Sequence, residues 1–214
     1  MDFLPDPTVI VAFSVAAIVL SITPGPDMTL FLSRTLSQGR MAGIVSMLGA
    51  TTGTMIHTVL AVVGISALIA ASPIAFGILK IVGALYLLWL AYQAVFKGST
   101  FTLENDKPKK QTSLKTSFLM GIGVNLLNPK VVLFFMTFLP QFVSASDPAA
   151  WQKMLFLGLF FGLLTAPLMA VMIYAARSFA DTLQKKPLVR RVIDYVFGSI
   201  FALFAVRILW ADSR

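Results

Sequence analysis

The residues of this sequence that could carry chemistry fall in two short polar stretches, each set inside a long apolar run. The first is Thr23-Pro24-Gly25-Pro26-Asp27, which interrupts an apolar run from about Val9 to Leu32. Proline lacks an amide hydrogen and clashes with the preceding turn, so a helix breaks there. A break followed by a charge is costly inside a lipid bilayer, where backbone groups must be satisfied within the protein. We therefore interpret this stretch as part of a functional site.

The second stretch is Asn128-Pro129-Lys130, which interrupts an apolar run from about Ser117 to Val143. Pro26 and Pro129 each suit the first position of a new helix. The cap before Pro26 would be near Gly25 or Thr23, and the cap before Pro129 would be Asn128. Each break would leave the positive end of a half-helix inside the membrane, and such an end binds anions and carboxylates. The alternative is a plain proline kink that neighbouring helices satisfy and that is open to no ligand.

Asp27 and Lys130 take equivalent positions after the two breaks, with opposite charges. A charge at mid-bilayer costs roughly 2.5–3.5 kcal/mol or more when it is alone. We expect the two side chains to face one central cavity and to neutralise each other in part. Asp27 could hold a substrate ammonium, while Lys130 or the half-helix N–H groups hold its carboxylate, which suits a zwitterionic amino acid. The alternative is a structural ion pair that locks two halves together.

Two asparagines and the single histidine complete the candidate site. Asn125 and Asn128 can offer amide groups to the same cavity. His57 lies on the face of its span that carries Gly49 and Gly53, and histidine can relay protons near neutral pH. His57 and Asp27 are the candidates for proton coupling, although His57 could equally be a neutral hydrogen-bonding residue between helices. The predicted substrate-binding set is Pro24, Gly25, Pro26, Asp27, Asn125, Asn128, Pro129 and Lys130.

The composition places these stretches in a membrane protein. The 214 residues are 57% hydrophobic and 12% charged, whereas soluble domains carry about 25% charged residues. The absence of cysteine excludes disulfides and thiol chemistry, and a single histidine disfavours a metal cluster, so we expect no metal and no cofactor. Six apolar segments are long enough to span a bilayer: about Val9–Leu32, Ala42–Ala70, Pro73–Phe96, Ser117–Val143, Met154–Ala176 and Val189–Trp210.

The links between the segments predict an orientation. Twelve of the basic residues lie in the links after the first, third and fifth segments, which the positive-inside rule places in the cytoplasm. Both termini then face outside. The net charge of +8 therefore comes from basic residues in the links beside apolar spans, and it does not indicate binding to nucleic acid. The first residues lack a basic region, so we do not expect the first segment to be a cleaved signal peptide.

The order of the segments predicts one all-α transporter domain over residues 1–214. Three segments lie in a first repeat of about 1–96, a polar cytoplasmic linker covers about 97–115, and three lie in a second repeat of about 116–214. An odd number of spans per repeat inverts the second copy in the membrane. Paired interrupted segments at matching positions of inverted repeats are typical of transporter substrate sites. The expected fold is six transmembrane helices in two inverted three-helix repeats, with helices 1 and 4 broken.

These stretches resemble the motifs of a known family. Thr23-Pro24-Gly25-Pro26-Asp27 resembles the first-span motif of the LysE/RhtB amino-acid exporters. The run from Gly121 through Asn128-Pro129-Lys130 to Phe142 resembles their fourth-span motif, and Leu79 to Leu90 is similar to their third span. The resemblance covers nearly the whole chain and is weak in the fifth span.

The resemblance implies a secondary exporter of amino acids or close derivatives in the bacterial inner membrane, driven by proton entry. From the two inverted halves we expect it to work by alternating access. Family members have Asp or Asn at the position of Asp27, so the resemblance does not assign the proton to that carboxylate. The implied partners are an amino-acid substrate, protons and the lipid bilayer, with a homodimer through small-residue helix faces as a further option.

Two other classes of protein compete with this interpretation. A metal or other cation exporter of the wider superfamily would need clustered intramembrane ligands, and the chain offers Asp27 and His57 alone. A membrane enzyme is disfavoured because the chain has no cysteine, and Ser46 and His57 are too far apart along one helix to form a dyad.

Overall fold

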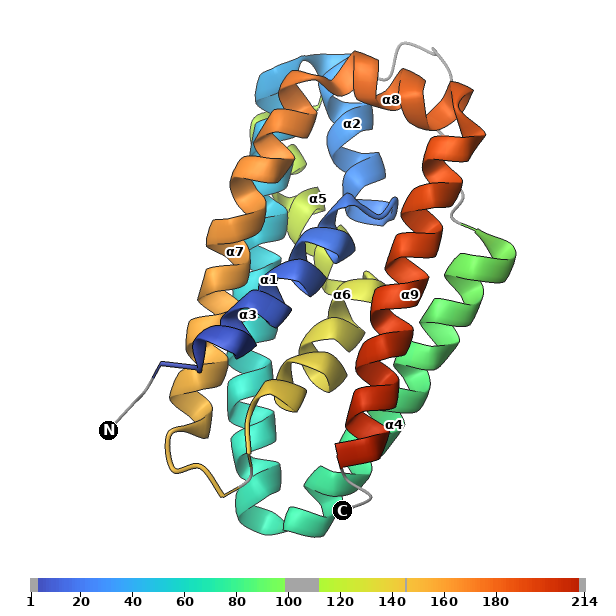
Figure 1. Cartoon of the computed structure of the whole chain (residues 1–214). Coiled ribbons are helices and arrows are strands. Elements are labelled where there is room, and N and C mark those ends of the chain that lie inside the picture. Colours follow the sequence, from blue (N-terminus) through green and yellow to red (C-terminus); the bar gives the residue numbers. More distant parts are fainter. Residues whose placement is uncertain (1–3, 99–111, 145, 212–214) are drawn as a thin grey trace.

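The computed structural model describes residues 4–98, 112–144 and 146–211, and the described chain is helical without any strand (Figure 1). The predicted linker over residues 97–115 lies largely outside the described residues. The α-helices are α1 Pro7–Ile22, α2 Pro26–Gln38, α3 Arg40–Ala71, α4 Pro73–Tyr92, α5 Leu114–Leu126, α6 Pro129–Leu133, α7 Ala150–Tyr174, α8 Ala176–Lys185 and α9 Pro187–Ala211. Two π-helical turns, η1 Gln93–Lys97 and η2 Phe134–Phe138, and one 3₁₀ turn, η3 Leu139–Phe142, continue α4 and α6.

The chain is a multi-pass membrane protein by the length and apolar character of its helices. Four stretches are long enough to cross a bilayer alone: α3, α4 with η1, α7 and α9. The pair α1–α2 is bent by 52° and the pair of α5 with Pro129–Phe142 by 53°. If each bent pair is one crossing, the described chain has up to six, and both predicted breaks are confirmed.

The helix boundaries follow from proline, serine and glycine chemistry. Proline takes the first turn of α1, α2, α4 and α6, where its missing amide hydrogen costs nothing. Ser72 caps α4 by accepting a hydrogen bond from the Ala75 amide at 3.1 Å. Gly39 separates α2 from α3 with φ of 89°, a left-handed conformation that favours glycine. The chain therefore turns back into the bundle directly after α2.

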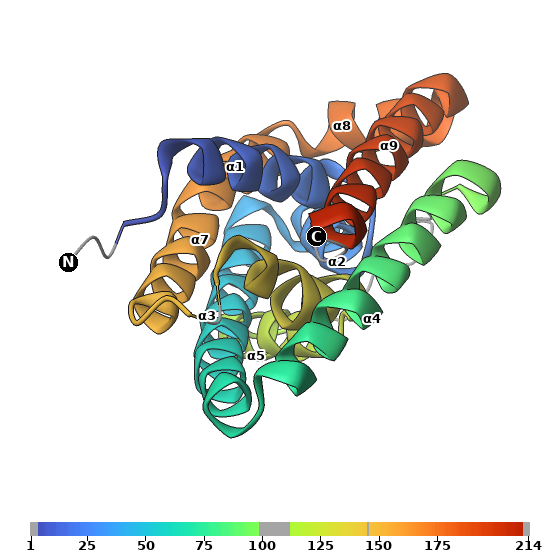
Figure 2. The same ribbon diagram turned by 60° about the horizontal axis from the view of Figure 1, so that its bottom comes forward.

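Phenylalanine side chains hold the second half of the broken α5–α6 pair in the middle of the bundle. Phe134 and Phe138 of η2 are 1% and 0% exposed. Phe134 packs against Phe13 of α1 and Phe161 of α7, and Phe138 lies against Phe201 of α9. Figure 2 shows this segment surrounded by α1, α3, α4, α7 and α9. The core of the protein is thus organised around the broken pair.

Glycines set the closest helix contact, between α3 and α5. A Cβ atom on Gly49 would overlap the Phe118 carbonyl oxygen, and one on Gly121 would overlap the Ser46 carbonyl oxygen. Small residues at such positions let helix backbones approach within a membrane. The glycines of this face therefore serve helix packing, and the contact brings the end of α5 against α3.

The links from α2 to α3 and from α7 through α8 to α9, which carry basic residues, lie at one end of the bundle (Figure 1). Helix α8 lies across this end, where α2 ends and α3 begins (Figure 1). Its apolar residues Ala180 and Leu183 pack with Met28 and Leu32 of α2. Sequence reasoning treated this segment as a link and missed the helix, although its apolar residues recur at helical spacing. We refer to this end as the basic end.

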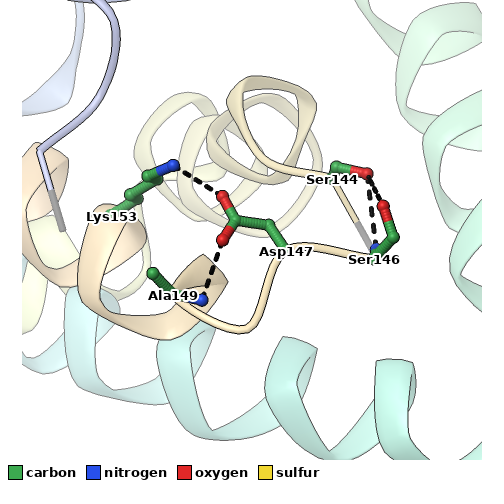
Figure 3. Close-up of polar contacts among 5 residues, drawn as sticks. All are labelled: Ser144, Ser146, Asp147, Ala149 and Lys153. Carbon is green, nitrogen blue, oxygen red and sulfur yellow. Dashed lines mark hydrogen bonds and ion pairs between the residues drawn. The ribbon is translucent and has the colours of Figure 1, made fainter. Parts of the chain in front are cut away.

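A polar turn at the opposite end joins η3 to α7 (Figure 3). Asp147 accepts hydrogen bonds from the Ala149 amide at 2.8 Å and from the Lys153 ammonium at 2.6 Å. Ser146 donates its amide to the Ser144 hydroxyl at 3.3 Å. The hydrogen bond from Lys153, followed by that from Ala149, holds the pKa of Asp147 below its ordinary value of 3.8. Asp147 therefore stabilises the start of α7 in its ionised form.

We expect Asp147→Asn to lower the melting temperature of the detergent-solubilised protein at pH 7. The folded pKa is depressed, so the stabilisation is present above pH 3.8 and is lost as the pH falls through the lower folded value. The difference from wild type should shrink between pH 5 and pH 3, roughly the window of a carboxylate with a depressed pKa. Asp181→Asn is the control, because the Asp181–Lys185 pair is 52% and 73% exposed. Equal melting temperatures for Asp147→Asn and Asp181→Asn at pH 7 would contradict this account.

Candidate substrate site

The two breaks meet at a cavity enclosed by α1, α2, α3, α5, α6 and α7. It holds about 580 Å³ of empty space, part of which is open to the surroundings. Five of the eight predicted binding residues line it: Gly25, Asp27, Asn125, Asn128 and Lys130. The other three, Pro24, Pro26 and Pro129, line a second and wider hollow toward the basic end, which Gly25 also borders. The structure therefore brings both breaks together, with the prolines on one side of Gly25 and the charges on the other.

Asp27 is held by a residue from the opposite half of the chain. Its Oδ2 accepts a hydrogen bond from Asn125 Nδ2, at the end of α5, at 2.8 Å. Gly53 of α3 makes room for this asparagine, since a Cβ there would lie 2.6 Å from Asn125 Oδ1. The other oxygen, Asp27 Oδ1, is buried and has no hydrogen-bond partner among the described residues. Asn125 thus fixes one oxygen of the Asp27 carboxylate, and the other oxygen is free to accept a hydrogen bond.

Lys130 reaches across in the reverse direction. Its Nζ donates to the carbonyl oxygens of Leu20 and Thr23, at the end of α1, both at 2.7 Å. In an uninterrupted helix the Leu20 carbonyl would accept from the amide of residue 24, but Pro24 has none. Lys130 replaces that missing donor, and its positive charge suits the negative end of α1.

Asp27 and Lys130 line the same cavity, but the ion pair of the alternative interpretation is absent between them. No ion pair of 4 Å or less joins Asp27 to Lys130, although both residues are described and both line the cavity. Each is instead anchored on the opposite half of the chain. The alternative of a locking ion pair between them is therefore not what the structure contains.

His57 lies beside the second break but does not line the cavity. It is buried at 5% exposure, stacks on Phe135, and places Nε2 at 3.4 Å from the Asn125 carbonyl oxygen. Because a carbonyl oxygen only accepts, this contact is a hydrogen bond when Nε2 carries the hydrogen. Pro129 has no amide to donate to that carbonyl, which accepts instead from the Asn128 amide at 3.1 Å, and His57 adds a longer contact from α3. This geometry favours the structural interpretation of His57.

The two half-helix ends differ in their free donors. At α6, the Asn128 side chain accepts from the Lys130 amide at 3.1 Å, as the sequence predicted. At α2, Gly25 offers no side-chain cap, and the amides of Asp27 and Met28 have no acceptor among the described residues. The α2 end is therefore the one that presents unused N–H groups, and both residues that carry them line the cavity.

The cavity thus combines unused acceptors with unused donors. Asp27 Oδ1 and Asn125 Oδ1 can accept, and Asn128 Nδ2 and the two α2 amides can donate. A buried polar atom without a partner is expensive, so native proteins keep few of them without a reason. Within the described residues no group of three His, Cys, Asp or Glu side chains could hold a metal ion. The site is therefore chemically suited to a small molecule that carries both a cation and an anion.

Comparison with known proteins places the chain in a family. Residues 18–212 match the sequence profile of a family described as LysE type translocator. The chain is a member of the LysE type translocator family. The resemblance drawn from the two polar stretches is confirmed. No solved structure matches the chain.

Three curated relatives of this translocator are similar over almost their full length. An uncharacterized membrane protein, YrhP, of Bacillus subtilis (strain 168) is 31% identical over 207 residues, covering 92% of this chain and 97% of the relative. An uncharacterized membrane protein of Vibrio cholerae is 30% identical over 195 residues, covering 89% and 91%. A leucine efflux protein of Enterobacter sp. (strain 638) is 28% identical over 201 residues, covering 92% of each chain.

Sequence reasoning missed the part of the translocator's cavity that α3 and α7 supply. Met47, Ala50, Thr51 and Thr54 line it from α3, and Phe161 and Thr165 from α7. The α3 residues recur at i, i+3, i+4 and i+7, which is the spacing of one helix face. That face of small and hydroxyl residues was a usable signal. The backbone carbonyls that Lys130 contacts left no such signal, since every residue carries one.

We expect Gly53→Ala to disturb the site without breaking the fold. The new methyl group would lie 2.6 Å from Asn125 Oδ1, so Asn125 must move away from Asp27. Overpacking of this kind costs about 1–3 kcal/mol, or a few degrees of melting temperature for a chain of this size. Thermal melts and efflux rates should both fall.

Gly64→Ala is the matched control for that change. It lies on the same helix, and a Cβ there meets nothing within 4 Å. We expect Gly64→Ala to have the melting temperature and the efflux rate of the wild type. If Gly53→Ala behaves like Gly64→Ala in both measurements, the packing of Asn125 against α3 does not hold the site.

Proposed function

We propose that this translocator is a secondary active exporter of amino acids or close derivatives, located in the bacterial inner membrane. The observation that carries the proposal is the pairing of unused acceptors and unused donors within one buried cavity. Family membership supports an exporter, and the name of one relative, a leucine efflux protein, supports an amino acid as cargo.

The two ends of a zwitterion suit the unused acceptors and the unused donors of the cavity. Asp27 Oδ1 and Asn125 Oδ1 would accept from the substrate ammonium. The amides of Asp27 and Met28 at the start of α2, with Asn128 Nδ2, would donate to its carboxylate. In this assignment Lys130 is a supporting cation, since its ammonium is already engaged by the α1 carbonyls.

The apolar lining favours an uncharged side chain on the substrate. The part of the cavity away from the two breaks is lined by the thioether and aromatic side chains Met28, Phe31, Met47, Phe161 and Met169. Methionine adapts to substrates of varied shape. A basic side chain would leave a second cation without a described carboxylate to meet it. The substrate class we propose is therefore the neutral, apolar amino acids.

We further infer alternating access between two inverted repeats. The two bends are nearly equal, at 52° and 53°, and the contacts across them are reciprocal. In transporters built this way, the repeats rock about a site formed by discontinuous helices. We place the basic end in the cytoplasm, following the positive-inside rule, with both termini outside.

Proton coupling is assigned to Asp27 in this proposal. It is the carboxylate that would meet the substrate ammonium, and a proton on it would remove the charge that holds that ammonium. A state that binds the proton better then releases the substrate, which is antiport. His57 remains the second candidate, reaching Asp27 only through Asn125. The alternative of a metal exporter gains no support from the described residues.

The test is an export profile in cells that carry or lack this protein. Cells are loaded with dipeptides, which they hydrolyse, and the amino acids that accumulate outside are quantified. We expect neutral, apolar amino acids to appear at least several-fold faster with the protein than without it. An unchanged profile for every amino acid would overturn the proposed function.

Asp27→Asn is the variant that separates binding from coupling in the same assay. Asparagine keeps the acceptor oxygen that meets Asn125 but cannot carry a proton. In vesicles with an imposed pH gradient we expect it to lose the acceleration by the gradient, while exchange of labelled for unlabelled amino acid persists only at a raised KM, because the neutral amide lacks the charge that holds the ammonium. Fully gradient-driven efflux by Asp27→Asn would remove Asp27 from the coupling role.

A further inference from the structure

A second hollow lies between the cavity and the basic end. It holds about 1680 Å³ of empty space and is more open than the cavity. Its outer part is lined by Ser33, Arg34 and Ser37 of α2, Gln93 and Gly98 after α4, and Met120 and Val124 of α5. We call this hollow the vestibule.

The vestibule and the cavity share one residue, Gly25. The vestibule ends on Pro24, Pro26 and Pro129, which are the breaks themselves. A Cβ on Gly25 would lie 3.4 Å from Lys130 Nζ and 3.6 Å from its Cε. Gly25, which has no side chain, therefore lies between the two spaces. Its neighbour is Lys130, which reaches from α6 to the end of α1.

The polar wall of the vestibule is one face of α2. Pro26, Thr29, Ser33 and Ser37 recur at intervals of three or four residues, so they line a single helix face from the break to the basic end. This face runs alongside Asp27 and Met28, whose unused amides begin the same helix. A small polar solute that enters the vestibule is thus led to the α2 end of the cavity.

Arg34 is the cation on this face. It is half-buried, and its guanidinium donates to the Thr112 hydroxyl at 2.5 Å and to the Met120 sulfur at 2.7 Å. Neither partner is charged, and no described carboxylate lies within 4 Å of Arg34. The planar guanidinium suits the bidentate recognition of carboxylates, and burial strengthens such a contact.

We propose that the vestibule is an outer binding site for the carboxylate of the exported solute, with Arg34 as the residue that selects it. The solute is held at Arg34 and then passes Gly25 to the cavity, where its carboxylate meets the α2 amides. This inference rests on the proposed function, because it takes the solute to be an amino acid. It adds a site whose selecting residue, Arg34, was not among the predicted binding residues, although Pro24, Gly25, Pro26 and Pro129 border it.

The absence of cysteine from the chain allows a binding test that needs no transport. Ser37→Cys places the one thiol of the protein on the exposed vestibule wall, and a membrane-impermeant maleimide is applied from the basic end of vesicles. We expect a mixture of the nineteen amino acids other than cysteine, whose thiol would consume the maleimide, to slow labelling several-fold, and the amides of the protecting amino acids to have no effect. Adding Arg34→Gln should abolish the protection.

Arg40→Gln is the matched control for Arg34→Gln. Arg40 is an exposed arginine at the same end that lies over the Tyr174 ring at 5.2 Å, outside the vestibule lining. Protection of Ser37→Cys should persist in this background. Arg34→Lys keeps the positive charge but lacks the planar guanidinium, so it should retain part of the protection. Partial protection in this variant would show that the loss in Arg34→Gln comes from the contact with the carboxylate. Protection that survives Arg34→Gln, or protection by the amides, would overturn the outer site.

Efflux kinetics separate this inference from the proposed function. We expect Arg34→Gln to raise the KM for the exported amino acid about tenfold, a loss typical of one charge-assisted contact, with kcat nearly unchanged. If wild type exports amino acids and Arg34→Gln keeps its KM, the outer site fails alone. If wild type exports none, the proposed function fails, whereas carboxylate-specific protection of Ser37→Cys would still support the outer site.

Discussion

The structure depends on how two broken helices satisfy their backbone inside a membrane. Pro24 and Pro129 each deny a donor to a carbonyl four residues earlier, at Leu20 and Asn125, and no bulk water is present at bilayer depth to compensate. Lys130 donates to Leu20, and His57 approaches Asn125. The Asn125 carbonyl also accepts from the Asn128 amide at 3.1 Å, so it is the Leu20 carbonyl that depends on a donor from another span. The first break therefore cannot form independently of the bundle around it, and the charge of Lys130 has a structural reason to be there.

This constraint also shapes the site. Because Lys130 is drawn to the end of α1 and Asn125 to Asp27, the two charges line one cavity without forming an ion pair. One carboxylate oxygen and the first amides of α2 are left unused. A pair of broken helices thus leaves both acceptors and donors in one cavity. The exporter function that family membership supports would use these groups on the two ends of one zwitterion.

The local part of this arrangement could be predicted from sequence. Pro26 and Pro129 begin helices and Asn128 caps one, because each depends on the chemistry of a few adjacent residues. The meeting of Asp27 and Lys130 at one cavity was predicted from their matching positions after the two breaks. The partners of those charges could not be predicted. Lys130 bonds to backbone carbonyls, which no residue type marks, and the Asp27 contact needs Gly53 to let α5 approach α3. Helix α8 and the role of Arg34 depend on how distant segments pack at the basic end.

A double-mutant cycle on Pro24 and Lys130 tests the central claim that Lys130 supplies the donor that Pro24 lacks. Melting temperatures of the purified protein are compared for wild type, Lys130→Met, Pro24→Ala and the double variant. In the double variant the backbone amide that Pro24→Ala introduces can donate to the Leu20 carbonyl, so this variant should recover much of the loss caused by Lys130→Met. An orphaned buried carbonyl costs about 1–3 kcal/mol, and a coupling of that order is expected between the two changes. Strictly additive effects, or a Lys130→Met variant as stable as wild type, would contradict the account.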